Sequence, residues 1–137
     1  MKSILITGSS TGIGAAICEH FSDIGWRVFG SVRNIKDGEK LAEICGENFI
    51  PLIFDVTDIN AIKEAKKLVE SNLVASGLDC LVNNAGINIS GPMEYVDSDE
   101  LFLLIVYYLP YVYLMASLMM NLTYVKQSFN QISMFYL

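Results

Sequence analysis

Four short apolar runs alternate with three segments of helical periodicity in the first hundred residues, and this alternation constrains the fold most strongly. The apolar runs have the composition of strands that are covered on both faces. They lie at residues 4–7, 27–32, 49–54 and 78–82. The helical segments lie at residues 13–24, 36–45 and, after a cap at Thr57 or Asp58, up to residue 73. Alternating strands and helices need right-handed crossovers, so the sequence predicts an α/β fold with helices on both faces of a parallel sheet. We expect the strand order 3-2-1-4.

A glycine loop, residues 7–14, joins the first predicted strand to the first predicted helix and reads Thr-Gly-Ser-Ser-Thr-Gly-Ile-Gly. A helix that begins there presents unpaired N–H groups and a positive dipole end, which predicts an anion site. Gly8 would take the turn off the strand, Gly12 would let the backbone approach a pyrophosphate, and Gly14 would let the helix pack closely on the sheet. Taken alone, the loop is also compatible with a tight turn that binds nothing.

Two other kinds of site share part of this pattern. A Walker A loop is excluded because Ala15 follows Gly14 where that loop needs Lys and then Ser or Thr. Residues 8–12 fit the G-x-S-x-G elbow of α/β hydrolases, which needs a histidine base. The one histidine, His20, lies on the same predicted helix, about 15 Å along its axis from the loop. A hydrolase is therefore a weak alternative.

Charge and cysteine content exclude other functions. Nine Lys and Arg against fifteen Asp and Glu give a net charge of −6, which offers no positive field for a nucleic acid. The three cysteines are far apart and form no C-x-x-C pair, so we predict no metal site and reduced thiols. The first apolar run is too short for the apolar core of a secretory signal peptide, and we expect a cytoplasmic protein.

Two motifs together resemble a known family. The glycine loop reads T-G-x-x-x-G-x-G, and the fourth predicted strand ends in N-N-A-G at residues 83–86. With Asp55-Val56 after the third strand, this pattern resembles the short-chain dehydrogenases/reductases over residues 1–100. The resemblance implies a Rossmann-like, NAD(P)-binding half-domain and an NAD(P)-dependent oxidoreductase. The sheet would be incomplete, because members of this family are longer and have three further strands.

The resemblance also implies which residues contact the cofactor. Asp55 and Val56 would lie beside the adenine ring, and Asn83 would stabilise the sheet by hydrogen bonding. The expected pyrophosphate and ribose contacts come from both loops and are Gly8, Ser10, Gly12, Ile13, Gly14, Asn84, Ala85 and Gly86.

The end of the second predicted strand favours NADP over NAD. An acidic residue there would bind the ribose 2′-hydroxyl of NAD, whereas an arginine accommodates the 2′-phosphate of NADP. This chain has Arg33 and no carboxylate at that point. Thr11, in the cofactor loop, stands where many NADP-dependent relatives carry a second basic residue. A solvated strand-end charge remains the alternative for Arg33.

No catalytic residue is predicted. The family uses a tyrosine whose pKa is lowered by a lysine four residues later, and no tyrosine here has a lysine at that spacing. We therefore expect a truncated form that keeps the cofactor-binding motifs and is inactive alone. Its fourth strand would be an unprotected edge, which predicts poor solubility.

The composition changes near residue 100. Of the 24 charged residues only Lys126 lies after Glu100, and residues 101–125 carry no charge. We expect an apolar helical tail over residues 101–137, long enough to reach across a bilayer or to pack on another chain. Three interpretations stay open: an altered or out-of-register segment, a membrane anchor, and a helix buried against a partner. The alternative function is then an inactive, membrane-anchored or partner-binding remnant.

Overall fold

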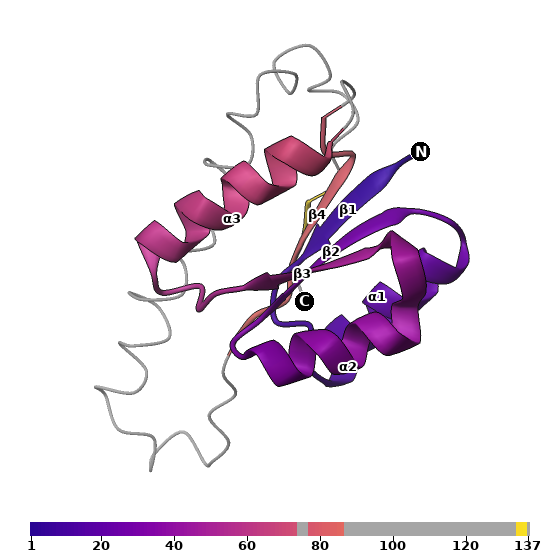
Figure 1. Cartoon of the computed structure of the whole chain (residues 1–137), viewed down its shortest axis with the longest axis horizontal. Coiled ribbons are helices and arrows are strands. Elements are labelled where there is room, and N and C mark those ends of the chain that lie inside the picture. Colours follow the sequence, from indigo (N-terminus) through magenta and orange to yellow (C-terminus); the bar gives the residue numbers. More distant parts are fainter. Residues whose placement is uncertain (74–76, 87–133, 137) are drawn as a thin grey trace.

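The computed structural model describes residues 1–73, 77–86 and 134–136 of the chain. The described residues form a sheet with helices packed on its two sides (Figure 1). The elements in chain order are β1 (Ser3–Ile6), α1 (Gly12–Asp23), β2 (Arg27–Val32), α2 (Ile35–Cys45), the 3-10 helix η1 (Gly46–Asn48), β3 (Phe49–Ile53), α3 (Ile59–Asn72), β4 (Cys80–Asn83) and β5 (Met134–Tyr136).

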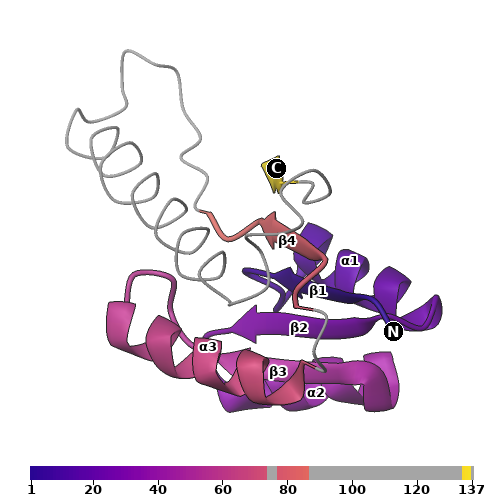
Figure 2. The same ribbon diagram turned by 90° about the horizontal axis from the view of Figure 1, so that it is seen from above.

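The sheet is parallel, with the strand order β3-β2-β1-β4-β5. This confirms the predicted α/β fold and the order 3-2-1-4. Seen from above, β4, β1, β2 and β3 follow one another across the molecule (Figure 2). α1 and α2 cover one face and α3 covers the other, as right-handed crossovers require (Figure 1).

Successive side chains of each strand enter two different cores. Leu5 of β1 and Phe29 of β2 are fully buried in the core under α3, together with Ile62 of that helix. Ile4 of β1 is buried in the opposite core, where it packs with Cys18 of α1. Each fully buried apolar side chain of this size contributes about 1.5–3 kcal/mol, so residues on both faces of the central strands stabilise the fold.

Side-chain caps determine where two helices begin. The carboxylate Oδ1 of Asp58 accepts hydrogen bonds from Asn60 N at 2.9 Å and Ala61 N at 3.0 Å, so Asp58 caps α3. Asn34 caps α2 by accepting a bond of 2.9 Å from Asp37 N. Thr11 precedes α1 but makes no side-chain cap bond. The first turn of α1 therefore keeps N–H groups that no capping side chain satisfies.

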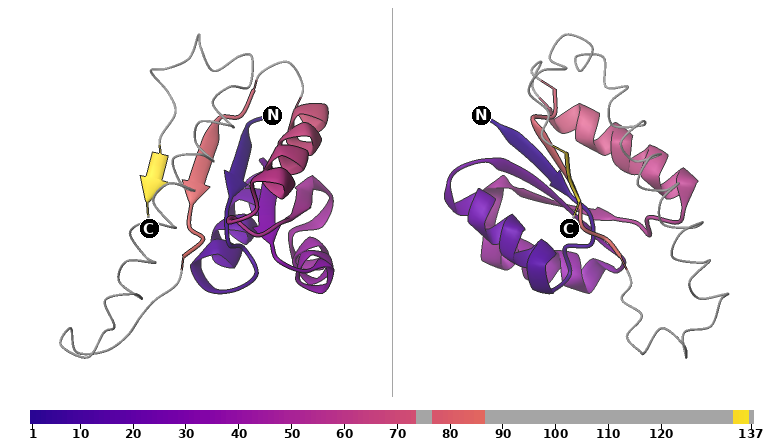
Figure 3. Two further views of the ribbon diagram at one scale, coloured as in Figure 1. Left: turned by 90° about the vertical axis from the view of Figure 1, so that its left-hand side faces the viewer. Right: turned by 180° about the vertical axis from the view of Figure 1, so that it is seen from behind.

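The expectation of an unprotected β4 edge is wrong. Residues Leu81–Asn83 of β4 pair with Met134–Tyr136 of β5, which lies at the border of the sheet (Figure 3). Of the tail predicted as helical over residues 101–137, only residues 134–136 are described, and they form a strand. Residues 101–125 lie outside the described residues, so the three interpretations of the tail stay predictions. Within the described part of the chain, no helix combines the length and apolarity needed to cross a membrane.

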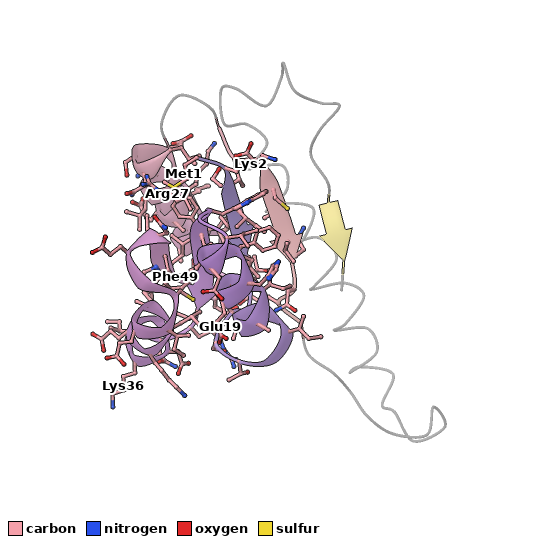
Figure 4. The ribbon with its side chains drawn as sticks, turned by 90° about the vertical axis from the view of Figure 1, so that its right-hand side faces the viewer. Met1, Lys2, Glu19, Arg27, Lys36 and Phe49 are labelled. Atoms are coloured by element: carbon pink, nitrogen blue, oxygen red, sulfur yellow. The ribbon has the colours of Figure 1, made fainter. Side chains whose placement is uncertain are left out.

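The amino ends of the strands are tied together by polar contacts. Ser3 N donates to Asp79 Oδ2 at 2.7 Å, which links β1 to the segment before β4. Arg27 Nη1 donates to the carbonyl of Asn72 at 2.6 Å, which links β2 to the last residue of α3. Met1, Lys2 and Arg27 lie together at this end, and Lys36 lies at the opposite end (Figure 4). The carboxyl ends of the strands are left for a site.

Candidate functional site

A cavity of about 350 Å³ lies at the carboxyl ends of the strands. Its lining comes from the glycine loop, from the ends of β2 and β3 and from the segment after β4. The chain leaves β1 toward β2 on one side, while β4 lies on the other side of β1. Such a reversal of strand order is where open α/β sheets bind ligands.

Most of the residues predicted from the sequence meet at this cavity. Gly12 and Gly14 are the two that do not line it. The predicted residues that line the cavity are Gly8, Ser10, Thr11, Ile13, Arg33, Asp55, Val56, Asn84, Ala85 and Gly86.

Gly8 has a left-handed backbone and a protein partner for each of its polar groups. Its φ is +68°, and a Cβ there would lie 2.7 Å from Cα of Ala85. Its N–H donates to Ser31 Oγ at 3.0 Å, and its carbonyl accepts from Asn84 Nδ2 at 2.9 Å. Only glycine fits this conformation and this close approach, and the turn is held from β2 on one side and from the loop after β4 on the other.

Gly14 lets α1 begin close to the same turn. A Cβ at Gly14 would overlap the carbonyl oxygen of Gly8 and lie 2.6 Å from Asn84 Nδ2. Gly12 has a φ of +62° and open space where a Cβ would be. The start of α1 therefore lies against the glycine loop, with Thr11 and Ile13 at the cavity. A helix N-terminus without a side-chain cap in this position can bind an anion.

Thr7 joins the loop after β4 to the glycine loop. Its buried hydroxyl oxygen accepts hydrogen bonds from the backbone N–H groups of Asn84 and Ala85, both at 3.0 Å. Asn84 Nδ2 also donates to the carbonyl of Thr7 at 3.0 Å. The side-chain donors of Asn84 are thus used within the protein, and the two loops form one unit.

Asn83 differs from the expectation that it stabilises the sheet through its side chain. It is buried, at 5% exposed, and its Nδ2 has no hydrogen-bond partner in the part of the chain that the structure describes. The side chain of the next residue, Asn84, instead bonds the glycine loop.

The adenine side predicted from the sequence carries two opposite charges. Asp55 Oδ1 accepts hydrogen bonds from Thr57 N at 2.9 Å and Thr57 Oγ1 at 2.8 Å. These bonds, with a smaller contribution from the Arg33 guanidinium, hold the pKa of Asp55 below its usual value. Asp55 is therefore ionised at neutral pH, and its Oδ2 has no hydrogen-bond partner among the described residues. It can accept a hydrogen bond from a ligand.

The sequence did not identify Ser31, Val32 and Phe54, which also line the cavity. Phe54 N donates to the carbonyl of Val32 at 3.0 Å, so the β2–β3 pairing continues past the end of β3 and brings both residues to the cavity. For Ser31 a signal was present, because a hydroxyl in a strand buried on both faces needs a partner. The described residues contain no cluster of His, Cys, Asp and Glu that could bind a metal ion.

Comparison with known proteins identifies relatives of this site and fold. A family model described as "short chain dehydrogenase" matches residues 2–128. The NADPH-dependent 3-dehydrocapnine reductase of Ornithobacterium rhinotracheale is 42% identical over 101 residues, which are 74% of this chain and 36% of the relative. The serine 3-dehydrogenase of Agrobacterium fabrum is 38% identical over 62% of this chain and 33% of the relative.

A solved structure of a reductase has a similar fold. The 3-ketoacyl-(acyl-carrier-protein) reductase from Brucella melitensis, complexed with NADH, aligns with a TM-score of 0.80 and 25% identity over 97% of this chain and 56% of that one. The chain therefore spans about a third of the length of these curated relatives and about half of the solved structure. The family match also continues 28 residues beyond residue 100, the limit of the resemblance in the sequence.

Proposed function

This chain belongs to the short-chain dehydrogenase family, whose members are NAD(P)-dependent oxidoreductases, and on that premise we propose that its cavity binds a nicotinamide dinucleotide, NADP in preference to NAD. The observation that carries the proposal is the glycine loop, which is bonded to β2 and to the segment after β4 and leads into an uncapped helix. This arrangement offers backbone N–H groups to a pyrophosphate.

The residues present fit such a group. Gly8 and Gly14 keep backbone close to backbone where a Cβ would collide, and Gly12 leaves open space beside the first turn of α1. The glycine loop would hold the pyrophosphate, while Asp55 and Val56 would contact the adenine. When bound, the dinucleotide supplies the hydride acceptor or donor of a redox reaction.

The preference for NADP depends on Arg33. This residue directly follows β2, is exposed and lines the cavity, and neither adjacent residue in the chain, Val32 or Asn34, is acidic. A guanidinium can form a paired, charge-assisted contact with a 2′-phosphate. One relative carries NADPH in its name, whereas the solved structure holds NADH, so the choice depends on this chain's own residues.

Hydride transfer is not proposed for residues 1–137. No lysine stands four residues after a tyrosine in this sequence, so the acid–base pair of the family has no counterpart here. We propose that residues 1–100 act as a cofactor-binding half-domain, to whose sheet Met134–Tyr136 add a fifth strand.

A titration with NADPH and with NADH, followed by cofactor fluorescence, tests the proposal on the full chain. Gly12→Ala is the informative variant, and Gly46→Ala is its matched control. Both glycines have positive φ, +62° and +74°, and open space around a Cβ, but Gly46 lies at the end of α2, away from the cavity. Both substitutions place a side chain on a residue with positive φ, which strains the backbone, so the control reports the effect of such strain away from the cavity.

We expect NADPH to bind more tightly than NADH, and we expect Gly12→Ala but not Gly46→Ala to weaken both. Absence of binding by the folded wild-type chain would overturn the proposed function. Equal affinity for the two cofactors would support dinucleotide binding at the cavity but would refute recognition of the 2′-phosphate by Arg33.

A further inference from the structure

Ser31 is the polar side chain that β2 contributes to the cavity. Its residue is 2% exposed and lies near the carboxyl end of β2, between Gly30 and Val32. Its Oγ accepts the Gly8 N–H at 3.0 Å, and its carbonyl accepts the Ser9 N–H at 2.8 Å. One residue of β2 therefore receives two successive N–H groups of the glycine loop.

The hydrogen bond to Gly8 matters because glycine has the widest conformational freedom of any residue. Gly8 adopts a φ of +68°, and Asn84 Nδ2 holds its carbonyl from the other side of the turn at 2.9 Å. Without the Ser31 hydroxyl, the Gly8 N–H would lack a partner. The backbone bond from Ser9 N to the Ser31 carbonyl would remain, but the turn at Gly8 would lose its side-chain contact with β2.

We propose that Ser31 is a positioning residue for the dinucleotide site: its hydroxyl, through the Gly8 N–H, keeps the glycine loop in the conformation that presents the first turn of α1 to the cofactor. This inference rests on the proposed function. Because the Gly8 N–H is already bonded to Ser31, the loop's free N–H groups are those farther along, at the start of α1. Ser31 sets where those groups lie.

The roles proposed for Ser31 and Arg33 predict different effects on the affinities for NADPH and NADH. The pyrophosphate is common to NADPH and NADH, so loss of loop positioning weakens both cofactors by the same factor. A residue that reads the 2′-phosphate affects NADPH alone. Comparing the two cofactors on one variant therefore distinguishes positioning from direct contact with the 2′-phosphate.

The experiment uses the full chain with three substitutions at one position. Ser31→Ala and Ser31→Val remove the hydroxyl, whereas Ser31→Thr retains it. We expect dissociation constants for NADPH and NADH to rise about tenfold in the Ala and Val variants and to return to near the wild-type value in the Thr variant. Ser3→Ala is the matched control, because Ser3 is also 2% exposed and its hydroxyl is also hydrogen-bonded, to the carbonyl of Gly77 at 3.1 Å, but it lies outside the cavity lining.

Amide hydrogen exchange in the absence of cofactor supplies a readout that does not depend on binding. The Gly8 amide should be protected in the wild type and the Thr variant and should exchange faster in the Ala variant. Unchanged Gly8 protection, or unchanged affinity in Ser31→Ala, would overturn the positioning role while leaving the proposed function intact. Weakening of NADPH alone would also overturn it, in favour of direct 2′-phosphate contact. Wild-type protein that binds neither cofactor would instead remove the proposed function, and this inference with it.

Discussion

Replacing Thr7 by valine tests whether the contact between the two loops holds the fold together. Valine keeps the branched shape of threonine but cannot accept the N–H groups of Asn84 and Ala85, each 3.0 Å from the hydroxyl oxygen. Both N–H groups lie in a partly buried segment, and Thr7 itself is 2% exposed. Serine at the same position keeps the acceptor and loses one methyl group.

The two variants should differ clearly in free energy of unfolding. Leaving a buried N–H without a partner costs about 1–3 kcal/mol, so two of them cost roughly 2–5 kcal/mol after allowance for partial access to water. Loss of one buried methyl group costs about 1 kcal/mol. A domain of this size has roughly 5–15 kcal/mol of stability in total, so Thr7→Val removes a large share of it and Thr7→Ser a small one.

Urea unfolding followed by tryptophan fluorescence measures this difference. Trp26 is the one tryptophan of the chain, and its ring lies 4.8 Å from that of Phe21 between centroids, so it reports on packing at the far end of the sheet. With a slope of about 1–3 kcal/mol per molar urea, the midpoint of Thr7→Val should fall by roughly 1–2 M relative to Thr7→Ser. Coincident midpoints for the two variants would refute the argument, because the hydroxyl would then contribute nothing beyond its methyl group.

Three further predictions concern Gly30, Asp55 and Cys18. Gly30→Ala places a Cβ 2.5 Å from Cε2 of Phe49, so it should destabilise the chain by about 1–3 kcal/mol, and Phe49→Leu in the same chain should recover part of that loss in urea unfolding. Asp55→Asn should lower stability at pH 7, because the Thr57 hydrogen bonds keep the pKa of Asp55 below the usual 3.8 in the folded state. That stabilisation is present above pH 3.8 and is lost as the pH falls through the folded pKa, so thermal melts of wild type and variant should converge in acid; a gap that persists there would contradict the assignment. Burial raises the pKa of the Cys18 thiol to about 12, so Cys18 should resist iodoacetamide at pH 8 until the chain unfolds, and peptide mapping that finds Cys18 alkylated in the native chain would show that the α1 core is open.

The strands, helices and their order could be predicted because each depends on local pattern. Apolar runs of strand length alternate with amphipathic segments, and Asp58 at the start of α3 supplies a side-chain cap that the sequence reduced to two candidates. The positions of the cavity residues followed from the motifs, since loops at the carboxyl ends of parallel strands meet at one edge of the sheet.

Contacts between distant parts of the chain could not be read in the same way. β5 has three residues, follows a mostly polar segment and pairs with β4 about fifty residues earlier, so local pattern does not predict its place in the sheet. The bond from Gly8 N to Ser31 Oγ joins residues 23 positions apart, and that from Asn84 N to Thr7 Oγ1 joins residues 77 apart. Spacing within a motif carries no information on such pairs.

Residues that line the cavity and buried residues behind the glycine loop consequently have different roles in cofactor binding. Asn84 was expected to contact the cofactor, yet its Nδ2 donates to the carbonyls of Thr7 and Gly8. The glycine loop leaves the backbone N–H groups at the start of α1 for the pyrophosphate, and these cannot be removed by substituting a side chain. Their position depends on buried residues behind the loop, chiefly Thr7 and Ser31. Substitution of those residues should therefore change cofactor affinity more than substitution of the exposed Thr11, although Thr11 lies at the cavity itself.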